Sequence, residues 1–362
     1  MASQIEEEEP LVPILTISVH DLRYFAGLLR GVNFANRATT NITKTGFTVT
    51  VEEARTLLAT AYVFADTFDE YVYNPPPESR PNSPVPGTQS TDSDFAENTA
   101  VEIPLNRLID CLNLFHTSGA GTSGPKQKSW RHAGDDDEDD DAPHANALDH
   151  NGRIDQYFYH GTGEKGAGMR MSYVGPGHPL TFLIAGEAAG PTATFEIATY
   201  EAEPHLELPF DADQTVLKII LKSSWLRDAL FSLDPSCDKL TFIGNPPIQR
   251  DNTRATTSRS AALKPMLRIQ ANGILGSTEM DYPNDREVLE TFECAQTTSF
   301  SYRLAHIART ARALQSSTKT SLRIDAEGLL SLQFLMPSPK PRGGTSDAFI
   351  EFRCLPLDDD LV

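Results

Sequence analysis

Hydrophobic positions recur along the chain with two different periods, which predict a mixture of helices and strands. Apolar residues spaced three and four apart predict amphipathic helices. They occur at 20–32, 105–115, 223–233 and 302–314. Shorter runs rich in β-branched and aromatic residues predict strands. They occur at 39–43, 47–51, 57–73, 169–173, 180–184, 194–200, 216–221, 239–243, 266–270, 274–279, 321–324, 329–335 and 348–355.

The order of these elements is similar in the two halves of the chain. Each half reads as a strand, a helix, several strands, a second helix, a hairpin and a final strand. Because this order lacks the strand–helix–strand rhythm of parallel sheets, we expect an α+β fold with antiparallel sheets covered on one face. Asn272-Gly273 is expected to turn a hairpin with positive φ, and Ser223 and Ser224 are expected N-caps of the third helix.

Three polar stretches interrupt the pattern and are expected to be unstructured insertions. They cover 74–98, which is rich in proline, 117–168, which contains the acidic run Asp135–Asp141, and 245–262. Each lacks the apolar residues whose burial offsets the entropy lost when a chain becomes ordered. An acidic run without glycine-punctuated ligand spacing is typical of a solvated segment rather than a cation site.

The formal charge of the 362-residue chain is −19, which argues against a protein that coats nucleic acid non-selectively. Fourteen acidic residues lie in Glu6–Glu9, Asp135–Asp141 and Asp358–Asp360, so the rest of the chain carries only −5. A body this close to neutral can carry a basic face. Arginines lie away from the apolar side of all four predicted helices, where they could contact a phosphate backbone or form an ordinary solvated surface. They are Arg23, Arg30, Arg107, Arg227, Arg309 and Arg312.

Residues that would indicate an enzyme, a metal site or a membrane protein are not found. The four cysteines are far apart, which suits a reducing compartment and predicts neither disulfides nor zinc. There is no basic segment followed by an apolar core at the start and no apolar run that would span a bilayer. Nucleotide-binding, metalloprotease and serine-hydrolase motifs are absent. We therefore expect a soluble intracellular protein with no catalytic residue, no metal and no cofactor.

Several motifs resemble the Rad-one family of checkpoint clamp subunits. They are collinear with the family across both halves, outside the three insertions. They are Val19-His20-Asp21-Leu22-Arg23, Gly46-Phe47-Thr48-Val49-Thr50-Val51, Leu108-Ile109-Asp110-Cys111-Leu112, Gly175-Pro176-Gly177-His178-Pro179-Leu180, Met280-Asp281-Tyr282-Pro283 and Phe349-Ile350-Glu351-Phe352-Arg353-Cys354.

The resemblance implies the DNA sliding clamp fold of proliferating cell nuclear antigen, with two similar domains of antiparallel sheets and two helices each. The implied boundaries are 11–200, a connector at 201–215 and 216–357, with acidic tails at 1–10 and 358–362. Three different subunits, the others being of the Rad-nine and Hus-one type, would close a ring around double-stranded DNA without sequence specificity. The implied role is DNA damage checkpoint signalling and repair in the nucleus, with a clamp loader and recruited repair and checkpoint proteins as further partners.

The resemblance also suggests site residues. The implied DNA-facing side chains are Arg23, Arg30, Arg227, Arg309 and Arg312, whereas Asp110, Asn113 and Phe231 occupy other channel positions. The implied subunit interface pairs the strand 194–200 with the strand 274–279, through Thr194, Phe195, Ile197, Ile274 and Thr278. On the connector, Leu206, Leu208 and Phe210 are candidate walls of a groove for partner peptides. The alternative for these three is that they only hold the connector to the sheet.

Two other functions and one form of regulation are considered. Some members of this family have been credited with 3′–5′ exonuclease activity in DNA repair, although Asp69 and Glu70 lack the alternating spacing that would aim both carboxylates at one metal. A homotrimeric processivity clamp is the third possibility. Ser3-Gln4 and Thr88-Gln89 fit the preference of checkpoint kinases, so Ser3 and Thr88 are phosphorylation candidates.

Overall fold

The computed structural model describes residues 12–75, 98–118, 167–186, 190–247, 265–274, 276–337 and 348–357. The acidic tails and most of the three expected insertions, with the candidates Ser3 and Thr88, lie outside these residues.

The described residues form three sheets in which every recorded strand pair is antiparallel, as the α+β expectation requires. A five-stranded sheet has the order β5-β1-β7-β8-β9, a nine-stranded sheet the order β14-β10-β16-β17-β18-β4-β3-β2-β6, and a four-stranded sheet the order β13-β12-β11-β15. The strands of the first half are β1 (Leu15–Val19), β2 (Arg37–Thr43), β3 (Gly46–Glu53), β4 (Leu57–Phe64), β5 (Glu70–Tyr73), β6 (Thr99–Pro104), β7 (Gly168–Tyr173), β8 (Leu180–Ala185) and β9 (Thr192–Ile197). Those of the second half are β10 (Thr215–Lys222), β11 (Cys237–Gly244), β12 (Leu267–Gly273), β13 (Gly276–Tyr282), β14 (Leu289–Cys294), β15 (Thr298–Arg303), β16 (Lys319–Asp325), β17 (Leu330–Met336) and β18 (Ala348–Cys354).

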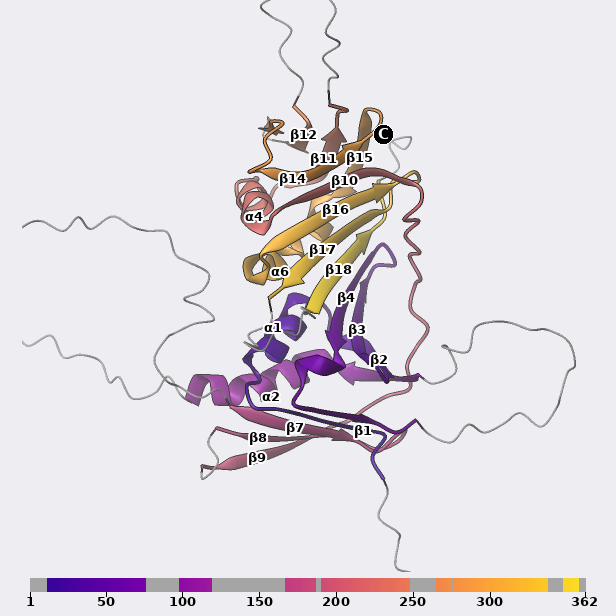
Figure 1. Cartoon of the computed structure of the whole chain (residues 1–362), viewed down its shortest axis with the longest axis vertical. Helices are drawn as coiled ribbons and strands as arrows, with labels where there is room; N and C mark the ends of the chain where they lie inside the picture. The colour runs from indigo at the N-terminus through magenta and orange to yellow at the C-terminus, as the bar shows by residue number, and fades with distance from the viewer. Residues whose placement is uncertain are drawn as a thin grey trace, which may run out of the picture.

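The two halves are joined within the nine-stranded sheet. The last strand, β18, pairs with β4 of the first half, with Ile350 opposite Ala61 and Phe352 opposite Ala59. Both halves therefore share one hydrogen-bonded sheet, although their sequences are separated by the connector. Residues 201–214 have no regular secondary structure and run along the side of the molecule away from the helices (Figure 1).

The helices lie together on one side of the molecule (Figure 1). They are α1 (Arg23–Gly31), α2 (Leu105–Ser118), α4 (Ser223–Phe231), α5 (Leu304–Ala308) and α6 (Ala311–Ser316), with a short 3-10 turn η1 (Ala65–Thr67) after β4. Helix α4 contacts α6, α6 contacts α1, and α1 contacts α2. These contacts produce a continuous row of helices that crosses the junction between the halves.

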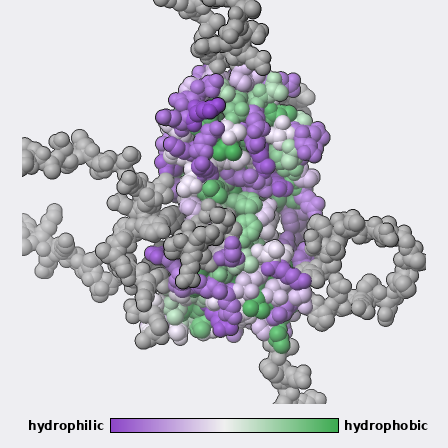
Figure 2. All heavy atoms as spheres, in the orientation of Figure 1, coloured by the Kyte–Doolittle hydropathy of each residue, from purple (hydrophilic) through white to green (hydrophobic). Residues whose placement is uncertain are grey.

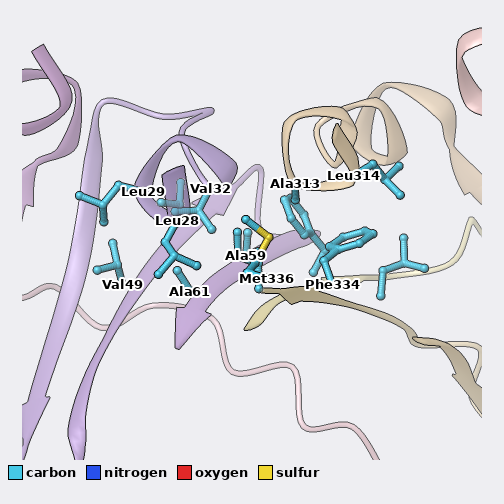
Figure 3. Close-up of a cluster of buried hydrophobic side chains, with 14 of the residues drawn as sticks. Leu28, Leu29, Val32, Val49, Ala59, Ala61, Ala313, Leu314, Phe334 and Met336 are labelled. Atoms are coloured by element: carbon cyan, nitrogen blue, oxygen red, sulfur yellow. The ribbon is translucent and has the colours of Figure 1, made fainter. Parts of the chain in front are cut away.

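The junction is closed by small and apolar side chains from both halves. Leu28 and Val32 of the first half and Ala313 of α6 lie on either side of Ala59 and Met336, above the strands (Figure 3). Gly31 is the point of closest approach, because a Cβ added there would lie 2.3 Å from Ile350 Cδ1 and 3.7 Å from Ala313 Cβ. Close packing of this kind makes the junction part of the main hydrophobic core.

Several predicted elements differ from the observed ones. The segment 302–314 is not one helix, since Tyr302 and Arg303 belong to β15 and the remainder divides into α5 and α6. At the break, Thr310 Oγ1 donates to the Ile307 carbonyl at 2.7 Å, a local bond of the type that bends helices. Helix α1 begins at Arg23 rather than at His20, because the Asp21 carboxylate accepts the Arg23 backbone N–H at 3.0 Å.

Two local predictions are wrong. Neither Ser223 nor Ser224 caps α4, because the cap position is Lys222. The buried hydroxyl of Ser223 instead bonds with those of Thr320 at 2.9 Å and Ser317 at 2.8 Å. Asn272 and Gly273 lie within β12, opposite Ser277 and Gly276, so the hairpin turns after them. The positive φ of 143° is found at Gly276, where glycine has no Cβ to oppose it.

Candidate nucleic-acid and subunit interfaces

Three of the five arginines predicted to face DNA are paired with carboxylates of the same chain. Arg23 Nη2 lies 2.5 Å from Asp21 Oδ2, and Arg227 Nε lies 3.1 Å from Asp228 Oδ1. Arg309 lies outside α5 and α6, at the break between them, and donates to both Glu53 oxygens at 2.8 and 2.9 Å. This bidentate bond raises the pKa of Arg309. The charges of these guanidinium groups are therefore compensated locally.

Arg30 and Arg312 have different surroundings. Arg30 Nη2 donates to Asn113 Oδ1 of α2, and Arg312 Nη1 donates to the Asn33 carbonyl at 3.1 Å. Both acceptors are neutral, so these bonds position the two guanidinium groups without neutralising them. Because Asn33 follows Arg30 by three residues, the two side chains lie near the same end of α1, at the junction of the halves. Burial lowers the pKa of Arg30, but an arginine stays charged at neutral pH.

The outer helices of the row have a different character. On α2, Arg107 and Asp110 are both exposed, so opposite charges lie within one turn. On α4, the Trp225 and Phe231 side chains are 43% and 59% exposed. Sequence reasoning noted Phe231 and missed Trp225. The sequence did contain a signal for Trp225, since this large aromatic residue lies next to Leu226 but outside the apolar stripe of the helix and is therefore expected to be exposed.

The two strands predicted to form subunit interfaces are edge strands at opposite ends of the described structure. β9 pairs only with β8 in the five-stranded sheet, and β13 pairs only with β12 in the four-stranded sheet. The sheets that contain them lie at the bottom and top of Figure 1. Hydrophobic residues reach the surface in both the upper and lower halves of the face in Figure 2. An unpaired strand edge is a template for another strand.

The individual interface residues differ in accessibility. Thr194 and Thr278 are exposed on β9 and β13, and Phe195 is half-buried. Ile197 is buried within its own half. Ile274 lies in the turn before β13 rather than in the strand, and its side chain is 91% exposed. β9 also ends earlier than expected, because Tyr200 turns away to form a bridge with Glu102 of β6.

The three connector residues face the sheet. Leu208 is only 6% exposed and packs in a small cluster with Leu58 and Leu329, against which Leu206 and Phe210 also pack. The backbone is held as well, since Arg353 Nη1 donates to the Leu208 carbonyl at 2.8 Å. These contacts favour the second interpretation of the connector, in which the three side chains hold it to the sheet.

A buried charged cluster supports this attachment. Glu351 is almost fully buried on β18 and accepts from Ser331 Oγ at 2.7 Å, Arg353 Nη2 at 2.9 Å and Arg323 Nη2 at 3.3 Å. The Arg323 guanidinium lies 4.8 Å from the centre of the Phe210 ring. The two arginines thus satisfy one buried carboxylate and at the same time contact the connector.

A shallow polar hollow lies beside the first part of the connector. Its lining includes Arg37, Arg55, Glu102, Glu203 and His205. Arg37 Nη1 lies 2.5 Å from the buried carboxylate of Glu102, and the Arg37 guanidinium stacks 4.5 Å from the Tyr200 ring centre. The hollow is accessible from outside, whereas the side chains of the Leu208 cluster are packed against the sheet.

Potential metal-binding and nucleophilic side chains of the described residues have the following surroundings. No group of three or more His, Cys, Asp or Glu side chains is arranged there to hold a metal ion. Asp69 bonds to His20 at 2.8 Å, and Glu70 lies 4.0 Å from Arg170. The thiol of Cys354, 3.8 Å from His306 Nδ1, is buried, which raises its pKa to about 12. Across the ranges described, no helix combines the length and apolar character needed to cross a membrane.

Comparison with known proteins identifies the family and the fold of the chain. A family model described as "Repair protein Rad1/Rec1/Rad17" matches residues 14–336. The chain is 27% identical to the cell cycle checkpoint protein RAD1 of Mus musculus, over 99% of this chain and 98% of the relative. It is 26% identical to the DNA damage checkpoint control protein rad1 of Schizosaccharomyces pombe, over 93% and 84%. It is 25% identical to the DNA repair exonuclease REC1 of Mycosarcoma maydis, over 96% of each.

The fold is also found among solved structures. Proliferating cell nuclear antigen from Entamoeba histolytica superposes with a TM-score of 0.60 at 12% identity, covering 96% of this chain and 100% of that one. The expected sliding clamp fold is therefore confirmed. With the family match spanning most of the sequence, the chain belongs to the Rad1/Rec1/Rad17 family of repair proteins.

Proposed function

We propose that this chain is a non-catalytic subunit of a heterotrimeric clamp that encircles DNA at damage sites in the nucleus. The observation that carries the proposal is the sliding clamp fold with open strand edges at its two ends and a row of helices along one side. Its two halves would act as clamp domains at 11–200 and 216–357, with 201–215 as the connector. The membership of a checkpoint and repair family supports this role.

The proposed DNA contact is electrostatic and centred on the junction of the halves. Arg30 and Arg312 bond to neutral oxygens, so their charge is available to phosphates. Arg23, Arg227 and Arg309 contribute less, because carboxylates already compensate them. Contacts to phosphates position a protein without reading base sequence, so the ring would slide on any duplex.

The strand edges favour different neighbours over a homotrimer. Pairing β9 of one copy with β13 of another would place Glu196 on a strand next to Glu279 and Asp281. Like charges on facing strands are destabilising. A homologous subunit with another edge sequence would avoid this repulsion, which supports partners of the Rad-nine and Hus-one type.

Recruitment would use the outer side of the subunit. The polar hollow at Arg37, Arg55 and His205 borders the connector and is open, whereas the connector's own apolar side chains are buried. Repair and checkpoint proteins, and the clamp loader, would reach this side while the helices face DNA.

An exonuclease function is the competing proposal, because a relative is named a DNA repair exonuclease. In this chain, the Asp69 and Glu70 carboxylates lie beside the basic groups of His20 and Arg170. Metal-dependent nucleotide release by the purified protein, abolished by Asp69→Asn with Glu70→Gln, would overturn the non-catalytic role. Release that is unaffected by these substitutions would come from a contaminant or another site.

The test of the clamp is assembly. The chain is co-expressed with the two sister subunits, and the mass of the complex and its retention on closed circular DNA are measured. We expect a one-to-one-to-one complex that is retained on circular DNA and slides off after linearisation. A stable homotrimer of the chain alone, or no complex with the sisters, would refute the proposal.

A further inference from the structure

Helix α4 exposes an aromatic ring on the face that is turned away from the sheet. The Phe231 side chain is 59% exposed, more than any other large hydrophobic side chain on the described helices. It lies about 140° around the helix axis from Leu226 and about 200° from Ala229, and both of these residues are buried. The main packing contacts of α4 are with α6, β10 and β16. The Phe231 ring therefore points to the open side of the row of helices.

The internal repeat of the chain shows what is unusual about this position. Buried residues have the same spacing around the two equivalent helices, where Leu22, Phe25 and Leu29 of the first half correspond to Leu226, Ala229 and Leu233 of the second. In this register, Arg23 corresponds to Arg227. Gly27, which has no side chain, corresponds to Phe231. One helix thus presents bare backbone at the position where the other presents an aromatic ring.

Helix α4 has no uncompensated cation that could bind a phosphate. Its only charged residues are Arg227 and Asp228, which pair with each other at 3.1 Å between Nε and Oδ1. The neighbouring helix α6 carries Arg312, whose guanidinium bonds to a neutral carbonyl. A polyanion attracted to the middle of the row would therefore extend over α4, where the exposed group is the Phe231 ring rather than a free charge.

On the basis of the clamp proposed above, we propose that Phe231 is a stacking site for an unpaired base of the encircled DNA. The bases of an intact duplex are stacked on one another, so they offer no face to the ring. A base in a single-stranded gap exposes its π face, and because every base has such a face, the contact needs no particular sequence. Stacking also removes apolar surface of Phe231 from water. The assembled clamp therefore binds gapped DNA more tightly than intact duplex.

Two DNA substrates test the site, an end-blocked duplex and the same duplex with a short central single-stranded gap. In the assembled ring, Phe231→Ala should lower the affinity for gapped DNA at least about 5-fold, because an aromatic ring stacked on one base contributes at least that much. The affinity for intact duplex should change less than about 2-fold. Phe231→Trp, which enlarges the stacking surface, should match or exceed the wild-type affinity for gapped DNA. Because Phe231 is exposed, these substitutions leave the core of the subunit unchanged.

Salt dependence separates stacking from contact with phosphates. Stacking releases no counterions, so the loss caused by Phe231→Ala should be the same at low and high salt. The matched control is Trp225→Ala, which removes the other exposed aromatic side chain of α4. Trp225 lies about 120° from Phe231 around the helix axis, so this variant should change the affinity for gapped DNA less than about 2-fold.

The fluorescent base 2-aminopurine, placed in the gap, reports stacking directly. Its emission should fall when the wild-type ring binds and should stay unchanged with the Phe231→Ala ring. Equal losses of affinity for both DNA substrates, or an unchanged affinity for gapped DNA, would overturn the stacking site while leaving the clamp intact. A loss that disappears at high salt would show an electrostatic contact and would also overturn it. Failure of the wild-type ring to assemble would instead refute the proposed function on which the site rests.

Discussion

Removing Arg30 and Arg312 together should selectively weaken the electrostatic grip of the assembled ring on DNA. Their hydrogen bonds go to Asn113 and to the Asn33 carbonyl, so each guanidinium keeps its charge for a phosphate. Each lost phosphate contact lowers the slope of log affinity against log salt by about 0.9, so the double alanine variant should lose about 1.8. Over a fourfold increase in salt, this difference corresponds to about 12-fold in relative affinity.

A matched double variant controls for the change in net charge. Arg227→Ala with Arg309→Ala removes the same two charges, but these guanidinium groups already pair with Asp228 and Glu53. The slope should then change by less than about 0.5, since few counterions are released at a compensated arginine. Fluorescence anisotropy of end-blocked duplex DNA with the assembled ring, titrated at several salt concentrations, measures both slopes.

Two results would refute the reasoning. An unchanged slope for the Arg30 and Arg312 variant would show that the junction of the halves does not touch DNA. Equal losses in the two double variants would show that internal ion pairs do not decide which arginines contact phosphate.

Three further predictions concern stability and reactivity. Gly31→Ala should lower the free energy of unfolding by about 1 to 2 kcal/mol, because its Cβ meets Ile350 Cδ1. Valine at position 350 lacks that methyl group, so in an Ile350→Val background Gly31→Ala should leave the free energy of unfolding in urea unchanged or raise it. If the two substitutions instead lowered the free energy of unfolding by the sum of their separate effects, the clash would be contradicted. Ala54 and Arg55 both have positive φ in the β3–β4 turn, so replacing them with Asn-Gly should add about 1 kcal/mol of stability, and a loss would show that the turn is not strained. Cys354, with its pKa raised to about 12 by burial, should resist iodoacetamide at pH 8 until the protein unfolds, as followed by mass spectrometry. The thiol of Cys354 ionises near pH 8.5 in the unfolded chain but stays protonated in the folded protein. Raising the pH above 8.5 therefore favours the unfolded state and should lower the free energy of unfolding.

Local patterns in the sequence were enough to predict the fold class and most of the helices and strands. The apolar spacing at 105–115 predicted α2, and alternation at 329–335 predicted β17, because burial of one face imposes these periods directly on the sequence. The collinear motifs were enough for the clamp family. One error arose at Thr310, where a local side-chain bond accompanies the break in the last helix. Another arose at Ser223, whose hydroxyl bonds with that of the distant Thr320 rather than capping its own helix.

The site could be predicted only as a set of candidates. The sequence places six arginines off the apolar faces of the predicted helices, and nothing in their spacing distinguishes Arg309 from Arg312. The partners come from distant segments: Glu53 is 256 residues from Arg309, and Asn33 is 279 residues from Arg312. Pairings over such separations depend on β18 joining β4 and on α6 packing against α1, which no local pattern encodes.

The sequence by itself determined which segments become helices and strands, that the sheets are antiparallel, and to which family the chain belongs, because these follow from local periodicity and collinear motifs. Only the tertiary structure decided that Leu208 of the connector is buried against Leu58 and Leu329, that Arg30 and Arg312 lie near the same end of α1, and that Arg309 pairs with Glu53. The physical reason is that burial, charge compensation and edge exposure are properties of neighbours in space. In this chain those neighbours lie in opposite halves or in separate sheets.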